Sequence, residues 1–397
     1  MLVLVLNSGG SSIKYRLFDM PAERIVAEGS VDGLGLSHAR FTHNSAGEKW
    51  QENRPIPDHL AGFELIFAKL QAELAQRDEE LKLIVHKLIH GGQHLGPVEI
   101  LDERAIKEVE RMAVVAAVHN VPALAGIEAV SKLAPKACQM GVFETGFFQT
   151  LPPYATVYGL PYELAQEHGL RKYGFHGASH RYISQRTPEF LGTDGPLRII
   201  SCHLGSGTSV AAILDGQGVE ISSGYTPQSG TLMSTRPGDF DPEVLFYLLH
   251  NGICDLAQLR QMMNKASGLA GISGIPGGDL RDLEAAAAKG DRRAQLAIDA
   301  FCYSVRKYIG SFLIPLGGLD VLVFTGGIGE NSSQIRAKIC HGLEWLGIKL
   351  DPQANATEKC DALINAADSQ VRIAILGTNE EIVVVRQAWQ HWLAHQN

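Results

Sequence analysis

Two stretches of the chain share one pattern of apolar and polar positions. Leu2–Phe18 contains an aliphatic run, the polar turn Asn7–Ser12 and a second apolar run, and Arg198–Leu214 repeats this order. Short apolar runs on either side of a glycine-rich turn predict a strand, a turn and a second strand. When Gly10 is aligned with Gly207, Ser-Ser-Ile falls on Thr-Ser-Val. A repeat this distant predicts two halves of related fold rather than a solenoid.

Elsewhere, helical spacing alternates with buried-strand runs, which is typical of an α/β protein. Ser267–Gly278 is rich in turn residues, and Gly326–Asn331 is expected to be a turn between a strand and a helix. The other expected helices are Phe63–Gln76, Glu103–Val118, Pro242–His250, Asp255–Met263, Leu280–Lys289, Arg292–Ile314 and a last one bearing Trp389 and Trp392, and the other expected strands are Leu83–Ile89, Ala137–Phe143, Leu319–Thr325 and Val371–Ile375.

Composition and charge narrow the class of protein. The 397 residues are 45% hydrophobic and 20% charged, which is typical of ordered globular chains of two or three domains. The net charge of −8, without a long block of like charge, makes nucleic acid an unexpected partner. No apolar run reaches the ~20 residues that span a bilayer, and Met1–Leu6 lacks the flanks of a signal peptide. The six cysteines form no Cys-x-x-Cys, so we expect a cytoplasmic protein without a membrane segment.

The chemistry is expected at the glycine-rich turns, because glycine lets backbone N–H groups approach an anion closely. The two matched hairpins, together with the segment Gly326–Asn331, indicate a polyphosphate ligand. None of the turns fits Gly-x-x-x-x-Gly-Lys-Ser/Thr, and Gly326–Gly329 does not complete Gly-x-Gly-x-x-Gly. The P-loop and Rossmann interpretations are therefore not favoured.

Short polar and glycine-rich blocks extend over essentially the whole chain. They are Asn7-Ser-Gly-Gly-Ser-Ser-Ile-Lys14, His86-Lys-Leu-Ile-His-Gly-Gly92, His119-Asn120, Val142-Phe-Glu-Thr145, Tyr173-Gly-Phe-His-Gly177 with Ser179-His180, Cys202-His-Leu-Gly-Ser-Gly207, Thr226-Pro227, Ser234-Thr-Arg-Pro-Gly-Asp-Phe-Asp-Pro242, Ser267-Gly-Leu-Ala-Gly-Ile-Ser273, Phe324-Thr-Gly-Gly-Ile-Gly-Glu-Asn331 and Gly377-Thr-Asn-Glu-Glu381. In this order they resemble the acetate kinase family of the actin, hexokinase and heat-shock-chaperone superfamily. So many collinear blocks are highly specific for that family.

The resemblance implies a fold, a reaction and partners. The fold would be α/β, with two domains of duplicated actin/hexokinase-like (ribonuclease H-like) fold, mixed β-sheets flanked by helices, and an active-site cleft between them. Residues 1–147 plus 382–397 would form the N-terminal, acceptor-side domain, and residues 148–381 the nucleotide-binding domain. The reaction would be the reversible transfer of a phosphoryl group from ATP to acetate, giving acetyl phosphate and ADP. It would need Mg²⁺, with Mn²⁺ as an alternative, in a homodimer.

The resemblance also assigns catalytic groups, namely Arg236, Glu144, His176 and Lys87. A guanidinium fork at Arg236 suits both the acceptor carboxylate and the phosphoryl oxygens. His176 and Arg236 would stabilise the transition state, in which phosphoryl transfer needs charge neutralisation and positioning more than covalent chemistry. His119 lies in a further matched block.

Binding residues follow from the same blocks. Asn7 and Glu380 would support Mg²⁺ through hard oxygen ligands. The acceptor would meet Lys87, Ile89, Val118, Phe175 and Pro227. Because Ile89 is bulkier than the family's usual valine or alanine, we expect a preference for an acid of one or two carbons. Nucleotide and phosphate would be held by Asn7, Ser12, Lys14, His203, Gly205, Ser206, Gly207, Asp279, Leu280, Arg281, Gly326, Gly327, Ile328, Gly329 and Asn331.

The chain departs from the family's pattern at five positions. Gly10 replaces a serine, Lys87 an arginine, Glu144 an aspartate, Phe148 a histidine and Ser206 an asparagine. These changes leave alternatives open: a related kinase acting on propionate or formate, a variant using pyrophosphate, or a nucleotide-binding paralogue without catalysis. A displacement of ~1 Å at such a site can change a rate by on the order of a hundredfold.

Overall fold

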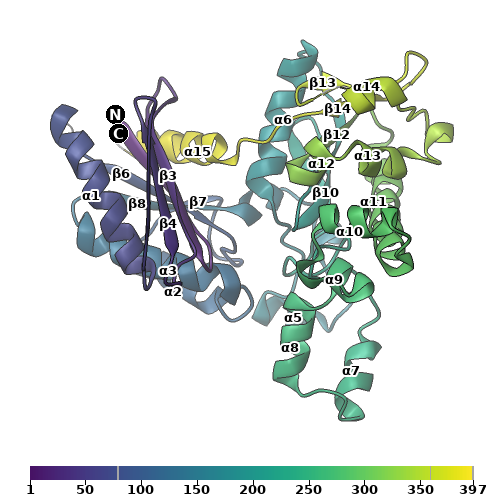
Figure 1. The fold of residues 1–397 in the computed structure, drawn as a ribbon, viewed down its shortest axis with the longest axis horizontal. Helices are drawn as coiled ribbons and strands as arrows, with labels where there is room; N and C mark the ends of the chain where they lie inside the picture. Colours follow the sequence, from purple (N-terminus) through teal and green to yellow (C-terminus); the bar gives the residue numbers. More distant parts are fainter. Residues whose placement is uncertain (78–79, 358, 396–397) are drawn as a thin grey trace. The chain divides into compact units, whose positions relative to one another are not determined.

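The computed structural model describes residues 1–77, 80–357 and 359–395 (Figure 1). The chain divides into two compact units. Unit 1 consists of Met1–Gly146 and Asn379–Asn397, and unit 2 of Phe147–Thr378. Each unit contains a mixed β-sheet and helices, which confirms the predicted α/β class. None of the helices in the described part of the chain is long and apolar enough to cross a membrane.

The sheet of unit 1 has eight strands in the order β5-β4-β3-β2-β1-β6-β8-β7. β1 pairs antiparallel with β2 and parallel with β6, and β6 pairs parallel with β8. The first predicted hairpin is therefore confirmed, with its turn at residues 9–11. The strands are β1 (Leu2–Ser8), β2 (Ser12–Asp19), β3 (Arg24–Asp32), β4 (Ala39–Ser45), β5 (Glu48–Arg54), β6 (Leu83–Leu88), β7 (Val98–Ile100) and β8 (Cys138–Phe143).

Helices cover the sheet of unit 1 unequally (Figure 1). Leu2, Leu4 and Leu6 of β1 belong to a core cluster with α1 and α3, whereas α15 packs against the opposite side of β1 and β6. Alternate residues of a strand face opposite ways, so Asn7 lies on the face away from α1 and α3. The helices are α1 (His59–Arg77), α2 (Glu103–Met112), α3 (Ala117–Leu133) and α15 (Glu380–Ala394), with the 3₁₀ turn η1 (Glu144–Phe148) at the end of the first segment.

One helix prediction in unit 1 was wrong. The helix expected over Glu103–Val118 ends at Met112, and a separate helix, α3, begins at Ala117. The apolar spacing continues across residues 113–118, which contain no glycine or proline. The sequence therefore does not indicate that the helix is interrupted there. Pro122, which lacks an N–H and usually argues against a helix interior, lies inside α3 and masked that helix.

The sheet of unit 2 repeats the central strand order of unit 1. Its order is β11-β10-β9-β12-β14-β13, where β9 pairs antiparallel with β10 and parallel with β12. β3-β2-β1-β6-β8 of unit 1 has the same directions, so the duplication predicted from the two hairpins is confirmed. The strands are β9 (Arg198–Leu204), β10 (Thr208–Leu214), β11 (Gln217–Ile221), β12 (Val321–Thr325), β13 (Ala362–Leu363) and β14 (Arg372–Ile375).

Helices cover both faces of this sheet. Ile200, Cys202 and Leu204 of β9 pack in a core with α11, whereas Ile199 packs with Ile183 of α6. Strand alternation therefore places residues 201 and 203 on the α6 face. The helical elements of unit 2 are α4 (Pro153–Thr156), α5 (Tyr162–His168), α6 (Gly177–Leu191), α7 (Glu243–His250), α8 (Leu256–Lys265), α9 (Gly268–Ser273), η2 (Pro276–Gly278), α10 (Leu280–Ala288), α11 (Arg292–Leu316), α12 (Gly326–Asn331), α13 (Ser333–Cys340), η3 (Glu344–Leu346) and α14 (Pro352–Thr357).

Two segments expected to be turns are partly helical. Ser267–Gly278 contains α9, and Gly326–Asn331 is itself the short helix α12. Gly326 has a φ of +77°, and a Cβ there would lie 2.8 Å from the Leu204 carbonyl oxygen. Glycine therefore lets α12 begin directly against β9, a backbone route that most side chains would block.

His86, in β6, makes the stability of unit 1 sensitive to acid. Its Nε2 lies 2.8 Å from Gln139 Oε1, and burial lowers the pKa of His86 to about 4 although this hydrogen bond opposes the shift. The folded pKa is below the unfolded value, so the neutral ring stabilises the fold fully above about pH 6.5. That stability is lost as the pH falls towards 4, by about 2–3 kcal/mol. Urea unfolding near pH 7 and pH 4.5 should show a smaller loss in His86→Gln.

The readout can be confined to unit 1. Three of the four tryptophans, Trp50, Trp389 and Trp392, lie in unit 1, so fluorescence in a Trp345→Phe background follows that unit. An equal loss of unfolding free energy in His86→Gln and its parent would contradict the prediction.

Candidate functional site

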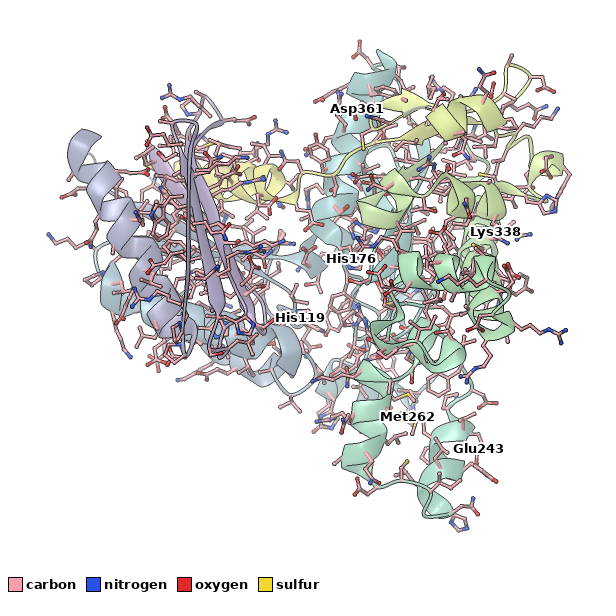
Figure 2. The ribbon with its side chains drawn as sticks, in the orientation of Figure 1. His119, His176, Glu243, Met262, Lys338 and Asp361 are labelled. Carbon is pink, nitrogen blue, oxygen red and sulfur yellow. The ribbon has the colours of Figure 1, made fainter. Side chains whose placement is uncertain are left out.

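The first candidate group lies in unit 2, where α6 begins beside β9 and β10. His176 precedes α6 with a φ of +56° (Figure 2). Its Nδ1 lies 2.8 Å from Ser209 Oγ, and its ring stacks on His203 with centroids 4.5 Å apart. Ser209 Oγ also lies 2.7 Å from Nε2 of the fully buried His180. These contacts fix the orientation of the predicted catalytic histidine.

Arg236 approaches the same place. A Cβ on Gly207 would lie 2.6 Å from Arg236 Nη2 and 3.2 Å from His176 Nε2, so the absence of a side chain lets both groups reach the turn. Arg236 Nη1 donates to the Pro227 carbonyl at 2.7 Å, which holds the guanidinium in position. Burial lowers the pKa of Arg236, but a guanidinium still remains protonated at neutral pH. The arrangement brings two donors together where an anionic group would fit.

A cavity of about 650 Å³ includes the same turn, through Gly205 and Ser206. This volume is within the range of small-molecule sites. Most residues predicted to hold the nucleotide meet in it, although they come from separate segments of unit 2. Those that line it are Gly205, Ser206, Asp279, Leu280, Arg281, Gly327, Ile328 and Asn331, and the other lining residues are Ser234, Gly277, Glu284, Ser332, Ser333 and Gln334.

Local contacts hold this cavity's wall. Asp279 caps α10 by accepting from the Arg281 N–H, and its carboxylate pairs with the Arg281 guanidinium at 2.6 Å. These bonds to Arg281 lower the pKa of Asp279 to about 2. Asn331 Nδ2 donates to the Gly327 carbonyl at 2.8 Å. Gly326 and Gly329 are buried behind the wall and do not line the cavity, so their contribution is to the packing of α12.

The second candidate group lies in unit 1 around Lys87. Its Nζ lies 2.8 Å from Glu144 Oε1 and also donates to Glu380 Oε2. The Lys87 and Glu144 side chains are only 9% and 4% exposed. Burial acts to lower the pKa of Lys87, but the two carboxylates outweigh it and raise the pKa above its usual value. Within unit 1, the Lys87 ammonium is thus paired with two carboxylates.

Both predicted metal ligands belong to unit 1. Asn7 lies near the end of β1 and Glu380 begins α15, and both present oxygen donors of the kind that Mg²⁺ prefers. In residues 1–77, 80–357 and 359–395, no group of three or more His, Cys, Asp or Glu side chains could hold a metal ion. Because Mg²⁺ is commonly held by one or two protein oxygens together with waters and phosphate oxygens, Asn7 and Glu380 stay predicted ligands.

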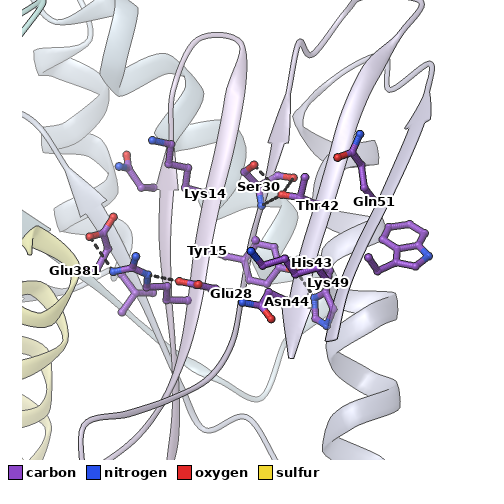
Figure 3. Close-up of a pocket in the computed structure, with 15 residues that line it drawn as sticks. Lys14, Tyr15, Glu28, Ser30, Thr42, His43, Asn44, Lys49, Gln51 and Glu381 are labelled. Atoms are coloured by element: carbon purple, nitrogen blue, oxygen red, sulfur yellow. Dashed lines mark hydrogen bonds and ion pairs between the residues drawn. The ribbon is translucent and has the colours of Figure 1, made fainter. Parts of the chain in front are cut away.

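The first hairpin contributes to a separate cavity of about 670 Å³ over the polar face of β1–β5 (Figure 3). Asn7 pairs with Lys14 in the strand register, and both line this cavity. Beside them, Arg16 is held by ion pairs that include Glu381 at 3.4 Å. Ser12 begins β2 at the turn but does not line the cavity. Two of the hairpin's three predicted phosphate-binding residues, Asn7 and Lys14, therefore line this cavity together.

The residues predicted to contact the acyl chain come from both units, Ile89 and Val118 from unit 1 and Phe175 and Pro227 from unit 2. Ile89 is half-buried just after β6, and Phe175 is buried just before His176. Pro227 is held by Arg236 through its carbonyl. Val118 belongs to α3, but its side chain lies outside the described residues. The acyl pocket stays a prediction.

Sequence reasoning missed Ser201 and Ser209 as partners of the histidines. The available signal was strand alternation in β9 and β10. Alternation alone places polar side chains at 201, 203 and 209 on a common face.

Comparison with known proteins identifies the family. The model of the acetokinase family matches residues 2–386. The acetate kinase of Carboxydothermus hydrogenoformans is 41% identical over 98% of this chain and 98% of its own length. That of Geobacillus kaustophilus is 41% identical over 97% of each chain. This chain belongs to the acetokinase family. It is therefore a kinase of the kind that transfers a phosphoryl group to a carboxylate.

Solved structures of acetokinases have the same fold. The acetate kinase of Porphyromonas gingivalis aligns with a TM-score of 0.86 at 38% identity, covering 98% of this chain and 99% of its own. A propionate kinase of Francisella tularensis aligns with a TM-score of 0.89 at 33% identity, covering 97% and 98%. The predicted family and fold are confirmed.

Five positions were predicted from the sequence to differ from the family's usual residues. Their surroundings in the structure differ from one another. Phe148 is buried in unit 2 with its ring edge-to-face on His180, 5.8 Å between centroids. Ser206 lines the nucleotide-sized cavity, and Gly10 lies exposed at the tip of its hairpin. Lys87 and Glu144, both exchanged, form a direct ion pair.

Removing the ammonium tests the Lys87 cluster. Lys87→Met would remove the ammonium that pairs with the buried Glu144 and the partly exposed Glu380, so we expect the free energy of unfolding of unit 1 to fall by about 3 kcal/mol. Adding Glu144→Gln should recover part of the loss. Lys132→Met is the matched control. Lys132 pairs with Glu128 on the surface, so its loss should leave the free energy of unfolding almost unchanged. Equal losses at the two lysines in urea unfolding would refute the buried pair.

Proposed function

We propose that this chain is an acetate kinase, which reversibly transfers the γ-phosphoryl group of ATP to acetate in the presence of Mg²⁺. The observation that carries the proposal is the convergence of His176 Nε2 and Arg236 Nη2 at Gly207. The neighbouring residues of the same turn line a nucleotide-sized cavity. A nucleotide in that cavity would direct its phosphates towards both donors.

Each group would have a distinct part in the transfer. Arg236 would neutralise charge on the phosphoryl oxygens, and His176 would donate a hydrogen bond to one of them. Lys87 would attract the acceptor carboxylate, while Glu144 and Glu380 would hold that ammonium in place. Mg²⁺, or Mn²⁺ in its place, supplies charge neutralisation at the phosphates when bound. Asn7 and Glu380 are the protein ligands that we propose for it.

The alternatives concern acceptor and donor. A propionate or formate kinase would use the same groups with a pocket of different size at Ile89, Val118, Phe175 and Pro227. Ser206 lies in the cavity wall where the family has asparagine, so a variant that uses pyrophosphate is the second possibility. A nucleotide-binding paralogue without catalysis is the third.

A hydroxamate-trapping assay distinguishes these alternatives. Formate, acetate, propionate and butyrate are each tested with Mg·ATP and with Mg·pyrophosphate. We expect most product from acetate and ATP, and at least tenfold less from butyrate, because a tight pocket penalises each added methylene by about 1–3 kcal/mol. Ile89→Ala should raise the butyrate-to-acetate ratio.

The same assay includes a catalytic variant as a control, and two of its outcomes would contradict the proposed function. Arg236→Ala should lower kcat by on the order of a thousandfold, the effect of losing a phosphoryl-binding arginine, while nucleotide binding persists. Product with pyrophosphate alone would reassign the donor. Nucleotide binding without product from any acid would overturn the proposed function.

We also propose that the enzyme acts as a cytoplasmic homodimer through α7. All six cysteines are free thiols, as expected in a reducing compartment. α7, which begins at Glu243 (Figure 2), is rich in apolar residues, yet none of its residues is buried. Phe246 and Tyr247 are 62% and 61% exposed. An apolar helix left open in this way is suited to cover the same helix of a second copy.

Light scattering after gel filtration tests the dimer. Phe246→Glu with Tyr247→Glu should convert a dimer into a monomer, because charges would be buried at the interface. Trp345→Glu is the control, since Trp345 is also exposed in unit 2 but belongs to η3. A wild-type monomer, or a dimer that survives the α7 double variant, would contradict the assignment.

A further inference from the structure

A single serine hydroxyl lies between two histidines in unit 2. Ser209 Oγ is 2.8 Å from His176 Nδ1 and 2.7 Å from His180 Nε2, and His180 Nδ1 is 2.9 Å from Ser201 Oγ. Ser201, Ser209 and His180 are all fully buried. A hydroxyl has one hydrogen, so Ser209 can donate to at most one ring nitrogen and must accept from an N–H of at least one ring.

Neutral rings allow three polarities. If both rings donate to Ser209, the buried Ser209 hydrogen has no acceptor among the described residues, which is costly. The other two polarities run in one direction along the row. In the first, Ser209 donates to His176 Nδ1, His180 donates to Ser209 from Nε2, and the bare Nδ1 of His180 accepts from Ser201. In the second, every bond is reversed, so His180 donates to Ser201 and the Ser201 hydrogen needs another acceptor. Of the described residues, His180 is the only hydrogen-bond partner of the Ser201 side chain.

The second polarity is therefore the less stable one. It would leave the hydroxyl hydrogen of Ser201 buried without an acceptor, and an unsatisfied buried donor is costly. In the first polarity the hydrogens of Ser201 and Ser209 both have acceptors. His176 then has a bare Nδ1, and in the neutral ring the proton must be on Nε2.

We propose that Ser209, His180 and Ser201 are positioning residues that hold His176 as a neutral imidazole with its proton on Nε2. Nε2 is the nitrogen that lies beside Gly207 and Arg236. His176 therefore presents a hydrogen-bond donor there, and is neither a general base nor an imidazolium. The role of this donor towards a phosphoryl oxygen rests on the proposed function, whereas the tautomer does not.

Two neighbours of His176 within unit 2, Arg236 and His203, agree with a neutral ring. Arg236 approaches Nε2 from the loop before α7, so an imidazolium would face a like charge. His203 of β9 stacks on it and has the same polarity: Thr378 donates to Ser179 at 3.0 Å, which leaves the Ser179 hydrogen for His203 Nδ1 at 2.8 Å. The two stacked rings thus both have the proton on Nε2, and the positive charge at this place is on Arg236.

Nitrogen NMR of the histidine side chains tests the tautomer directly. The full-length protein is labelled with ¹⁵N, and His176 and His180 are assigned by loss of their signals in His176→Gln and His180→Gln. We expect both rings to carry the proton on Nε2 near neutral pH, with Nδ1 unprotonated. An Nδ1-protonated ring or an imidazolium at His176 would overturn the proposal.

Kinetics test whether the row of hydrogen bonds positions His176. Ser209→Ala removes the donor to Nδ1, so we expect kcat to fall about tenfold, the effect of one hydrogen bond, with KM changed by less than about twofold. The variant should also gain a pH dependence of kcat between about pH 6 and 8, because Nδ1 becomes free to take a proton. Ser209→Thr keeps the hydroxyl and should retain most of the activity.

Two further variants keep the test decisive. Ser184→Ala is the matched control: Ser184 is a buried serine on α6 that donates to the Arg181 carbonyl, outside the row, and its loss should leave kcat unchanged. If Ser209→Ala does not fold, Ser201→Ala tests the other end of the hydrogen-bonded row. Removing the Ser201 hydroxyl should let His176 carry its proton on Nδ1 in a fraction of the molecules. A wild-type pH profile and tautomer in both variants would refute the positioning role.

The outcomes separate the tautomer from the function. An Nε2–H at His176 in a protein that forms no acyl phosphate would retain this inference and defeat the proposed function. Normal acetate kinase activity with an imidazolium at His176 would do the reverse.

Discussion

The pairing of β9 with β10 and β12, in a strand buried on both faces, is the constraint on which unit 2 depends. Ile200, Cys202 and Leu204 enter the core beneath α11, so Ser201 and His203 must face α6. A shift of one residue in register would place both polar side chains in the apolar core and aliphatic ones against the histidines. The hydrophobic core therefore determines the register, and the register determines the polar network.

In unit 1 the governing constraint is buried charge. An ammonium and a carboxylate removed from water are stable only when they are paired, and Lys87 meets this condition with Glu144 and Glu380. Unit 2 differs around Gly207, where the Arg236 guanidinium and the His176 ring both lie against a backbone turn. The charges of unit 1 are thus paired side chain to side chain, whereas unit 2 holds a cationic group beside a glycine.

The sequence predicted what depends on local pattern and missed what depends on contacts distant in the chain. Short aliphatic runs next to glycine-rich turns, such as Leu2–Leu6, indicate strands from local sequence alone. The hairpins and the duplication could therefore be predicted. α3 was missed because Pro122 gave a local signal that tertiary packing overrides. The family resemblance named Asp279 and Asn331, but only the fold shows that they line one cavity. The polarity of the serine–histidine row needs the burial of Ser201, which no local pattern reveals.

The departures from the family's pattern fall where the surroundings can accommodate them. A lysine at 87 is a point charge rather than a fork, and the longer side chain of Glu144 brings a carboxylate to within 2.8 Å of it. Phe148 replaces a titratable side chain beside His180 with a ring that offers no competing hydrogen bond, so the serine contacts of His180 are preserved. The ion pair of Lys87 with Glu144 and the hydrogen-bonded row through His180 are therefore both compatible with the exchanged side chains.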